Sequence, residues 1–302
     1  MSGGVDSSGF DKQSVRRGFE RGAARYDSSN FLAREIGTRM EERLELLRAV
    51  PTEALDVGSG TGAGARMLRS RYPACRVVEI DFALQMLEQS STPGSWWQRG
   101  LMKRLNRGGR VRVCADIEQL PFSERAFDMV WSNLVLHWTD LSRALPEVYR
   151  VLRPGGVFMF STLGPDTLKE LRASYAEADG FEHVNRFVDL HDIGDMLVQS
   201  RFGDPVMDME QLTLTYASVD ALLKELRSGG AGNANAGRPR GLSGKRGYAS
   251  MRSAYERFRI DGRVPATFEV VYGHAWRPQN DRRSAQGESI VEFHPRSEGG
   301  RR

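Results

Sequence analysis

The chain has 302 residues, enough for one large domain with a substantial core. Hydrophobic residues make up 40% of it and charged residues 27%, as in ordinary globular proteins, and its formal charge of +4 is too small to indicate a general nucleic-acid binder. No apolar run approaches the roughly 18–20 residues that cross a membrane, and the N-terminus lacks the apolar core of a secretory signal. The sequence therefore predicts a cytoplasmic protein with neither a membrane nor a nucleic acid as partner.

The two cysteines, Cys75 and Cys114, do not have the spacing of a zinc site or of a disulfide framework. Both lie among apolar residues, so we expect them to be buried and reduced. The sequence predicts no metal site.

The N-terminal region is expected to be helical. Residues 1–11 are rich in glycine and serine, and we expect them to be disordered. Over residues 12–48, apolar side chains recur at helical spacing in two successive segments that end before Pro51. Because amphipathic helices ahead of a larger domain can close over its ligand, we predict an N-terminal helical lid over residues 12–48. The apolar positions of its first segment are Val15, Phe19, Ala23 and Tyr26.

Short apolar strands then alternate with helical segments, which is typical of a doubly wound, mainly parallel sheet. Residues 50–163 carry five strands, and residues 164–276 add helices and two more strands, giving seven in all. We predict one α/β domain over residues 49–276, with helical insertions, followed by a disordered polar tail over residues 277–302. The strands are expected at 54–57, 75–80, 111–114, 127–132, 157–162, 212–216 and 267–275.

A glycine-rich turn follows the first strand. Its pattern is Asp56-x-Gly58-x-Gly60-x-Gly62, and the glycines let the backbone turn tightly and come close to a ligand. Dinucleotide-binding turns space their glycines as G-x-G-x-x-G and hold a pyrophosphate at a helix N-terminus. Here the spacing differs and an acid precedes the glycines, which favours a ligand with positive charge and no phosphate. S-Adenosylmethionine, with its ammonium and sulfonium groups, fits that description.

Polar side chains also end the next three strands. Asp81 is placed where a carboxylate can accept from two ribose hydroxyls, and Asp116 where one can accept from an adenine amino group. Ile117 can contact the adenine ring, and Asn133 ends the following strand. Because open α/β sheets bind ligands at the carboxyl ends of their strands, we predict that these residues surround the cofactor together with the glycine turn.

The order of these motifs resembles that of class I S-adenosylmethionine-dependent methyltransferases over residues 50–163. The motifs, in chain order, are DVGSGTG, EIDFALQML, ADIEQLPF, FDMVWSN and VLRPGG. The resemblance implies a Rossmann-like domain that binds S-adenosylmethionine as co-substrate. The matching positions, which the resemblance places around this co-substrate, are Asp56, Gly58, Asp81, Asp116 and Asn133.

Further segments, over about residues 15–276, are similar to the malonyl-acyl-carrier-protein O-methyltransferases of biotin synthesis. They are Arg17-x-Phe19 with Ala23-Ala24-x-Tyr26-Asp27, LVLHW, FSTLGPDTLKELR, DPVMDMEQLTLTY and ATFEVVYGHAW. The resemblance implies methyl transfer to the free carboxylate of a malonyl thioester on acyl-carrier protein or coenzyme A. A carboxylate with a pKa of about 4 is already ionised at neutral pH, so it needs positioning and desolvation but no general base.

Three residues are candidates for the acceptor side. Arg172, in the helix after the fifth strand, can hold the malonyl carboxylate by two parallel hydrogen bonds, with Lys169 as the nearest alternative. Tyr26 either closes over the cofactor as part of the lid or packs on the sheet. For His137, positioning or packing is favoured over a role as base.

The carrier protein of this family is acidic, and residues 228–247 contain no acid. The cations of this loop and of the helix after it could attract the carrier, or the loop could be a solvated flexible segment. These cations are Arg238, Arg240, Lys245, Arg246 and Arg252.

Two other functions remain open. FSTLGPDTLKELR and the tyrosine-containing N-terminal segment also resemble an assembly factor of respiratory complex I, which has the methyltransferase fold and is implied to hydroxylate a protein arginine. A methyltransferase for another small acid or for a quinone precursor would have the same cofactor site. We expect the malonyl methyltransferase, because the N-terminus has no clear transit peptide.

Overall fold

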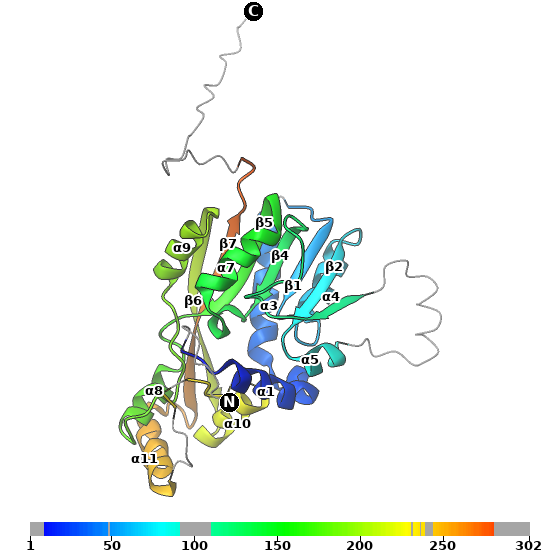
Figure 1. Cartoon of the computed structure of the whole chain (residues 1–302). Coiled ribbons are helices and arrows are strands. Elements are labelled where there is room, and N and C mark those ends of the chain that lie inside the picture. The colour runs from blue at the N-terminus through cyan, green and yellow to red at the C-terminus, as the bar shows by residue number, and fades with distance from the viewer. Residues whose placement is uncertain are drawn as a thin grey trace, which may run out of the picture.

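A seven-stranded sheet lies at the centre of the protein, whose computed structural model describes residues 9–47, 49–90, 110–230, 232–235, 237–238 and 244–280 (Figure 1). The strands are β1 (Glu53–Val57), β2 (Arg76–Asp81), β3 (Val111–Cys114), β4 (Phe127–Asn133), β5 (Leu152–Leu163), β6 (Gly203–Tyr216) and β7 (Val264–Trp276). Their order is β3-β2-β1-β4-β5-β7-β6, and every pairing is parallel except those of β7 with β5 and β6. The predicted mainly parallel, doubly wound sheet of seven strands is confirmed.

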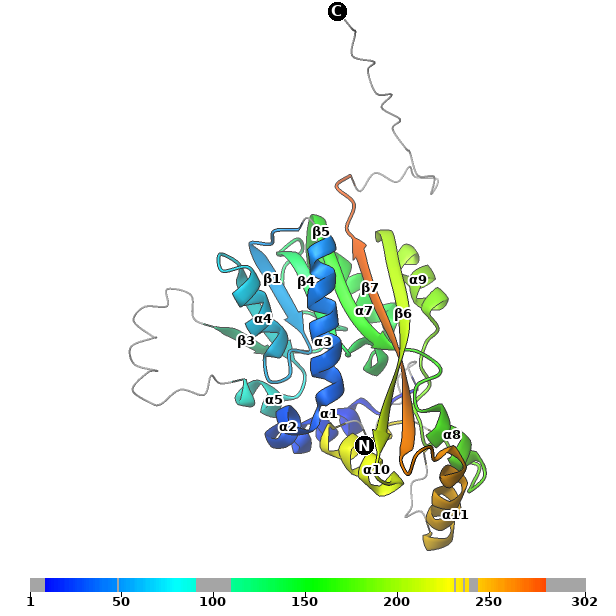
Figure 2. The same cartoon turned by 180° about the vertical axis from the view of Figure 1, so that it is seen from behind.

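Helices cover both faces of the sheet. The face turned to the viewer in Figure 2 carries α3 (Phe31–Arg43) and α4 (Ala63–Arg71). The opposite face, seen in Figure 1, carries α7 (Leu141–Val151) and α9 (Leu190–Gln199). In the part of the chain that the structure describes, no helix is long and apolar enough to cross a membrane.

Two apolar clusters hold these layers together. On one face, Ile36 and Met40 of α3 belong to the same cluster as Trp131 of β4. On the other face, Leu145 and Val148 of α7 belong to a cluster with buried side chains of β4 and β5. All five side chains are at most 1% exposed, and burying one such side chain contributes about 1.5–3 kcal/mol. Apolar burial therefore fixes the helices on the sheet and, with them, the strand ends that carry the site.

A further group of helices lies at the carboxyl ends of the parallel strands, at the bottom of Figure 1. They are α1 (Lys12–Gly22), η1 (Ala23–Arg25), α2 (Tyr26–Ser29), α5 (Leu84–Gln89), α8 (Lys169–Ala176), α10 (Val219–Ser228) and α11 (Lys245–Tyr255). The N-terminal segment α1–η1–α2 contacts α5 on one side and α10 on the other, while α8 packs against α11. The short helices η2 (Leu44–Leu46), η3 (Leu136–Trp138) and η4 (Glu256–Phe258) complete the chain's described elements.

Besides β5, which begins at Leu152 and so five residues earlier than expected, two elements differ from the sequence-based expectation. The first lid segment, expected as one helix up to Tyr26, is divided into α1, η1 and α2. The strand expected at 212–216 is the second half of β6, which is 14 residues long. The first half of β6 carries acids, and Arg39 and Arg43 of α3 form ion pairs with Glu210 and Asp208 at 2.6 and 2.8 Å. Cross-element ion pairs of this kind leave no apolar pattern in the sequence.

The inner ends of both predicted disordered segments are ordered. Phe10 is buried, and Asp11 caps α1 by accepting from the amide of Ser14 at 3.0 Å. Arg277 is buried and donates to the carbonyl oxygens of Tyr149 and Leu152. The expectation for 1–11 and 277–302 therefore fails where side chains pack or cap a helix, and the rest of those predictions, on 1–8 and 281–302, lies outside the described residues.

The two cysteines have different environments. Both are free thiols, and Cys75 is buried as predicted, but Cys114 is exposed. The prediction of burial was wrong for Cys114 because β3 is an edge strand whose residues alternate between partly buried and exposed positions.

Candidate active site

The glycine turn joins β1 to α4 with three glycines in the left-handed region. Gly58 has φ +63°, and a Cβ atom there would lie 2.2 Å from a methyl group of Val135. Gly62 has φ +81°, and a Cβ atom there would lie 2.4 Å from the hydroxyl of Ser90. A larger side chain at either position would be strained and would collide with its neighbour, so the turn can come close to a ligand only with glycine.

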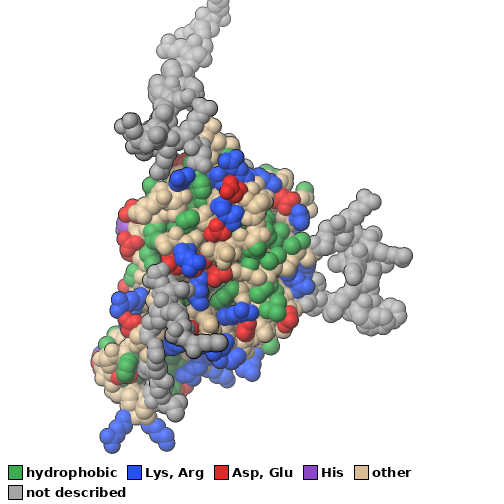
Figure 3. Space-filling model, in the orientation of Figure 1, with side chains coloured by type: hydrophobic (Ala, Val, Ile, Leu, Met, Phe, Trp, Pro, Cys, Tyr) green, Lys and Arg blue, Asp and Glu red, His purple; other side chains and the backbone are tan. Residues whose placement is uncertain are grey.

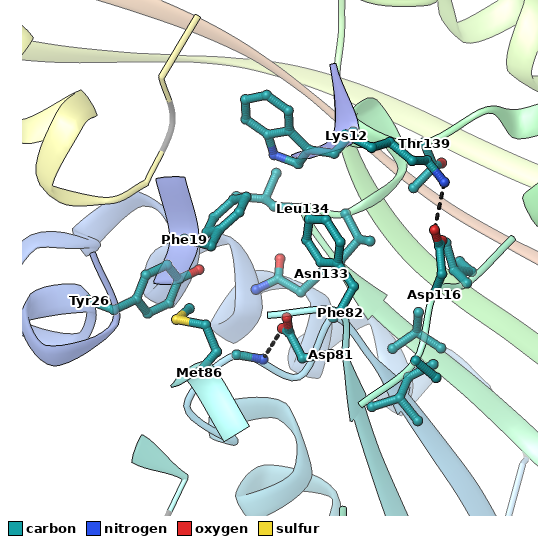
Figure 4. Close-up of a pocket in the computed structure, with 18 residues that line it drawn as sticks. Lys12, Phe19, Tyr26, Asp81, Phe82, Met86, Asp116, Asn133, Leu134 and Thr139 are labelled. Atoms are coloured by element: carbon teal, nitrogen blue, oxygen red, sulfur yellow. Dashed lines mark hydrogen bonds and ion pairs between the residues drawn. The ribbon is translucent and has the colours of Figure 1, made fainter. Parts of the chain in front are cut away.

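A cavity of about 640 Å³ opens beside this turn (Figure 4). Six of the eight predicted cofactor residues line it: Gly58, Gly60, Asp81, Asp116, Ile117 and Asn133. The remaining walls come mainly from the N-terminal segment, α5 and the segment after β4, and consist of Lys12, Phe19, Tyr26, Val57, Ile80, Phe82, Met86, Ala115, Leu134, Val135, Trp138 and Thr139. The structure thus brings together residues of four strand ends under a cover of α1 and α2.

Asp81 is held at the end of β2 by two backbone donors. Its carboxylate oxygens accept from the amides of Gly60 at 2.9 Å and Ala83 at 2.8 Å. Burial raises the pKa of Asp81 to about 6, against the lowering effect of these two hydrogen bonds. An ionised carboxylate in this position keeps free lone pairs toward the cavity, as a pair of ribose hydroxyls requires.

Asp116 is covered by a cation from the lid that the sequence did not single out. Lys12, the first residue of α1, forms an ion pair with Asp116 at 2.7 Å (Figure 4) and another with Glu118 at 2.6 Å. Lys12 therefore ties the start of α1 to the rim of this cavity. Its position in the sequence, at the polar start of an amphipathic helix, is that of any solvated lysine, so no local signal distinguishes it.

Asn133 connects three elements at the cavity. Its amide nitrogen donates to the carbonyl of Ala33 in α3 at 2.9 Å, and its amide oxygen accepts from Ser161 in β5 at 2.7 Å. The side chain lines the cavity while both of its polar ends are engaged, so it positions α3 against the sheet.

Asp56 and Gly62 do not line the cavity. Asp56 is 2% exposed, accepts from the amide of Ala65 in the first turn of α4, and has one oxygen without a partner among the described residues. Burial, followed by the charge of Glu79, raises the pKa of Asp56 to about 7. In this position Asp56 supports the turn from beneath, and a direct contact with a cofactor stays a prediction.

A second and larger cavity, of about 1330 Å³, adjoins the first. Phe19, Tyr26, Leu134 and Trp138 line both cavities and so mark their junction. Other walls of the second cavity come from α8, α10, the end of β6 and the segment 183–187. A nucleoside in the first cavity and an elongated acceptor in the second would therefore meet between these four side chains.

Tyr26 and His137 both face the second cavity and both are uncharged. Burial, then the charges of Asp81 and Asp27, raise the pKa of Tyr26 above its usual value, so its hydroxyl stays protonated. Burial lowers the pKa of His137 to about 3, so the imidazole is neutral at pH 7. Its Nδ1 lies 3.5 Å from the hydroxyl of Thr162, a distance that leaves at most a weak hydrogen bond. These two groups offer neutral polar contacts and no permanent charge.

Arg172 lies outside both sets of lining residues. Its guanidinium donates to the carbonyl oxygens of Pro165 at 2.9 Å and Thr167 at 3.1 Å. Its neighbour Lys169 forms an ion pair with Asp166 at 3.0 Å and does not line either cavity. Arg172 holds the turn ahead of α8, and Thr167 of that turn does line the second cavity. The direct grip on a carboxylate stays a prediction.

Several polar residues of the second cavity were not anticipated. His183 donates through Nε2 to the carboxylate of Asp179 at 2.9 Å and stacks on Tyr175 with ring centroids 3.7 Å apart. Asn185 is 8% exposed and its amide oxygen has no partner among the described residues. Among the described lining residues, Arg227 is the one lysine or arginine. These residues come from segments far apart in the chain, so their convergence has no signature in the sequence.

The predicted basic stretch is partly neutralised. Arg238 forms an ion pair with Asp11 at 2.7 Å, and Arg252 forms one with Asp220 at 3.1 Å. Lys245 and Arg246 are exposed in the first turn of α11, and Arg240 lies outside the described residues.

The chain is similar to known proteins over nearly its whole length. The family profile described as "Methyltransferase domain" matches residues 55–160. The chain is 50% identical over 288 residues to the malonyl-acyl-carrier-protein O-methyltransferase of Laribacter hongkongensis, and the aligned region covers 94% of this chain and 96% of that protein. It is 51% identical over 270 residues to the protein of the same name from Gallionella capsiferriformans, covering 89% and 92%. Among solved structures, the YcgJ protein of Bacillus subtilis shares the fold with a TM-score of 0.55 and 14% identity, covering 80% of this chain and 99% of that one.

Proposed function

The chain belongs to the malonyl-acyl-carrier-protein O-methyltransferases, a family of S-adenosylmethionine-dependent methyltransferases, and from that premise we propose the reaction that it carries out. The methyl group of S-adenosylmethionine is transferred to the free carboxylate of a malonyl thioester whose carrier is acyl-carrier protein. The product is the methyl ester that the family resemblance assigns to the start of pimeloyl-chain synthesis for biotin.

One observation carries this proposal: two cavities meet at four shared side chains. The first has the glycine turn, a carboxylate held by backbone amides and apolar walls, which fits a nucleoside with a cationic sulfur. The second has about twice the volume and is lined mostly by apolar groups. Such a shape fits a long, mainly neutral arm that ends in a small reactive group.

The junction suits an acceptor that is already ionised. When bound, S-adenosylmethionine supplies a methyl group on a positively charged sulfur. The carboxylate oxygen forms a bond to the methyl carbon, and the sulfur keeps the electron pair of its broken bond to that carbon. No proton has to be removed, and neither the neutral His137 nor the protonated Tyr26 is set up to remove one. Phe19, Leu134 and Trp138 exclude water from the same place, which strengthens attraction between opposite charges.

The arm of the carrier finds polar contacts along the second cavity. Asn185, which lines this cavity, is a candidate contact for an amide of the phosphopantetheine arm. Acyl-carrier protein and coenzyme A share this arm, and we propose the protein carrier because the family takes its name from it. Arg172 keeps its proposed role for the malonyl carboxylate, and the cytoplasmic location stays a prediction from the sequence.

The alternatives are not favoured. The relatives described above carry the malonyl name over most of this chain, whereas the complex I assembly factor and a quinone-precursor methyltransferase rest on short segments or on the cofactor site alone.

The test is methyl transfer from labelled S-adenosylmethionine to malonyl-acyl-carrier protein, with acetyl-acyl-carrier protein as the matched acceptor without a free carboxylate. We expect label on the malonyl thioester and none on the acetyl thioester. Absence of label, or equal label on both acceptors, would show that the proposed function is wrong. Expression in a bacterial strain that lacks this methylation step should restore growth without biotin.

A further inference from the structure

Four exposed cations stand on neighbouring helices at the bottom of the molecule. Arg21 and Arg25 belong to the N-terminal segment, and Lys224 and Arg227 belong to α10. None of the four forms an ion pair with another residue that the structure describes. Figure 3 shows Lys and Arg side chains gathering on the lower part of the face, where Figure 1 places α1 and α10. We call these four residues the α1–α10 basic surface.

The two helices that carry this surface are in close contact. A Cβ atom on Gly22 would lie 2.9 Å from the carbonyl oxygen of Ser228, and one on Gly18 would lie 2.8 Å from that of Gly230. The glycines thus let α1 approach the end of α10 directly, and the two helices present their outward side chains side by side.

The surface borders the opening of the acceptor cavity. Arg227 both lines the second cavity and is exposed, so it stands where the cavity meets solvent. Leu223, Leu226 and Gly229 of the same stretch line the cavity too, as does Tyr26 from the N-terminal segment. A molecule seated on the two helices would therefore lie over the entrance.

The acids on these elements do not neutralise the surface. Glu20 pairs with Arg16 at 2.9 Å, and Asp27 accepts from the hydroxyl of Thr61 at 2.5 Å. On α10, Asp220 pairs with Arg252 of α11, and Glu225 accepts from the hydroxyl of Tyr216 inside the cavity wall. Glu20 and Asp220 are thus neutralised by other cations, whereas Asp27 and Glu225 keep their charges, so the four cations of the surface outnumber the acids left on these elements by four to two.

We propose that the α1–α10 basic surface docks the acidic carrier protein, so that its arm enters the acceptor cavity past Arg227. Carboxylates of the carrier pair with Arg21, Arg25 and Lys224, and the guanidinium of Arg227 receives the phosphate that joins the arm to the carrier. Such rim charges act chiefly by steering the encounter, and their effect falls with ionic strength. This proposal rests on the proposed function, because it takes the carrier from there.

The experiment compares two acceptors with the same malonyl thioester: malonyl-acyl-carrier protein, and malonyl-pantetheine, which lacks both the carrier and the phosphate. The triple variant Arg21→Ala, Arg25→Ala, Lys224→Ala should raise KM for the carrier-bound acceptor at low salt by at least about tenfold. It should leave kcat/KM for malonyl-pantetheine within about twofold, because the removed charges meet only the carrier. The KM of the unchanged enzyme for the carrier-bound acceptor should rise with salt, and that of the variant should rise less.

The matched control is Arg125→Ala, Arg201→Ala. Both residues are exposed and lie at the opposite end of the sheet, ahead of β4 and β6. We expect this control variant to have an unchanged KM for both acceptors. The proposal would be overturned if the triple variant and the control had the same KM for the carrier-bound acceptor. It would also be overturned if the triple variant lost kcat/KM equally with both acceptors. If the unchanged enzyme methylates neither thioester, the proposed function fails. Docking is then measured by equilibrium binding of labelled carrier protein. If the triple variant and the control bind the carrier protein with equal affinity, the docking proposal is wrong.

Discussion

Asp81 combines burial with a predicted role, accepting hydrogen bonds from ribose hydroxyls, that needs its negative charge. Its pKa of about 6 lies above the usual 3.8, so it is ionised at pH 7 and takes up a proton as the pH falls through 6. The protonated form loses acceptor capacity toward the ribose hydroxyls. The affinity for S-adenosylmethionine should therefore be nearly full at pH 7 and decline as the pH falls through 6. Between pH 7 and pH 5 we expect the Kd to rise about tenfold, measured by isothermal titration calorimetry.

The Asp81→Asn variant supplies the control for this titration. It should bind S-adenosylmethionine weakly at both pH values, with a Kd that changes less than about twofold between them. A full pH dependence in the variant would assign the titration to another group, of which Asp56 is the nearest because burial raises its pKa to about 7.

Arg172 is the residue for which the sequence and the contacts suggest different modes of action. Replacement by Ala should raise KM for malonyl-acyl-carrier protein by at least about tenfold and leave the Kd of S-adenosylmethionine unchanged. Steady-state kinetics and calorimetry measure the two quantities. Unchanged KM, or weakened cofactor binding, would remove Arg172 from the acceptor side.

The Arg172→Lys variant separates direct from indirect action. Lysine keeps the charge but cannot reproduce the two guanidinium hydrogen bonds to Pro165 and Thr167. If Arg172 meets the carboxylate itself, lysine should recover part of the lost affinity. If it acts by holding the turn at Thr167, the Lys and Ala variants should be equally impaired and equally lowered in Tm.

Residues at strand ends could be foreseen, and residues that converge from distant segments could not. Asp81, Asp116 and Asn133 line the cavity because the ends of parallel strands must meet at one edge of the sheet. Lys12 and Arg227 reach the site from helices whose packing depends on the whole fold. Their local sequence is that of a solvated helix, so periodicity alone gives no reason to single them out.

At the scale of elements, buried strands were predicted best. β1 and β4 are almost entirely buried and appear as short apolar runs near their observed bounds. β6 is an edge strand whose first half alternates exposed and partly buried positions and carries charges. Its length is set by pairing with β7 from Gly203 to Tyr216, which is a long-range contact that local composition does not encode.

The N-terminal elements show a similar limit. The helical period of Val15, Phe19 and Ala23 was correct, but the segment is divided into α1, η1 and α2, which contact α5 and α10, and such long-range contacts have no signature in the local sequence. Phe19 of α1 and Tyr26 of α2 line both cavities. The predicted lid is thus a set of short helices next to the candidate site, and its closure over a ligand stays a prediction.

At the scale of the whole molecule, α3 and the sheet share one core, whereas buried residues of α1 and η1 lie in two smaller apolar clusters. Ile36 and Met40 of α3 belong to the same apolar cluster as Trp131 of β4 and Tyr255 of α11. This cluster joins the N-terminal region, the sheet and the helices at the acceptor cavity. Elements that share a buried core lose their stability together, since none can expose its part without opening a cavity in the others.

Thermal unfolding followed by circular dichroism should therefore show a single cooperative transition for the described part of the chain. S-Adenosylhomocysteine at 100 times its Kd should stabilise the folded state by about 2.7 kcal/mol. For a chain of this size that moves the whole transition up by roughly 5–10 °C. Asp81→Asn at the same ligand concentration should show a clearly smaller shift, because the ligand binds through that carboxylate. Two separate transitions, only one of which responds to the ligand, would contradict a shared core and would make the lid an independent unit.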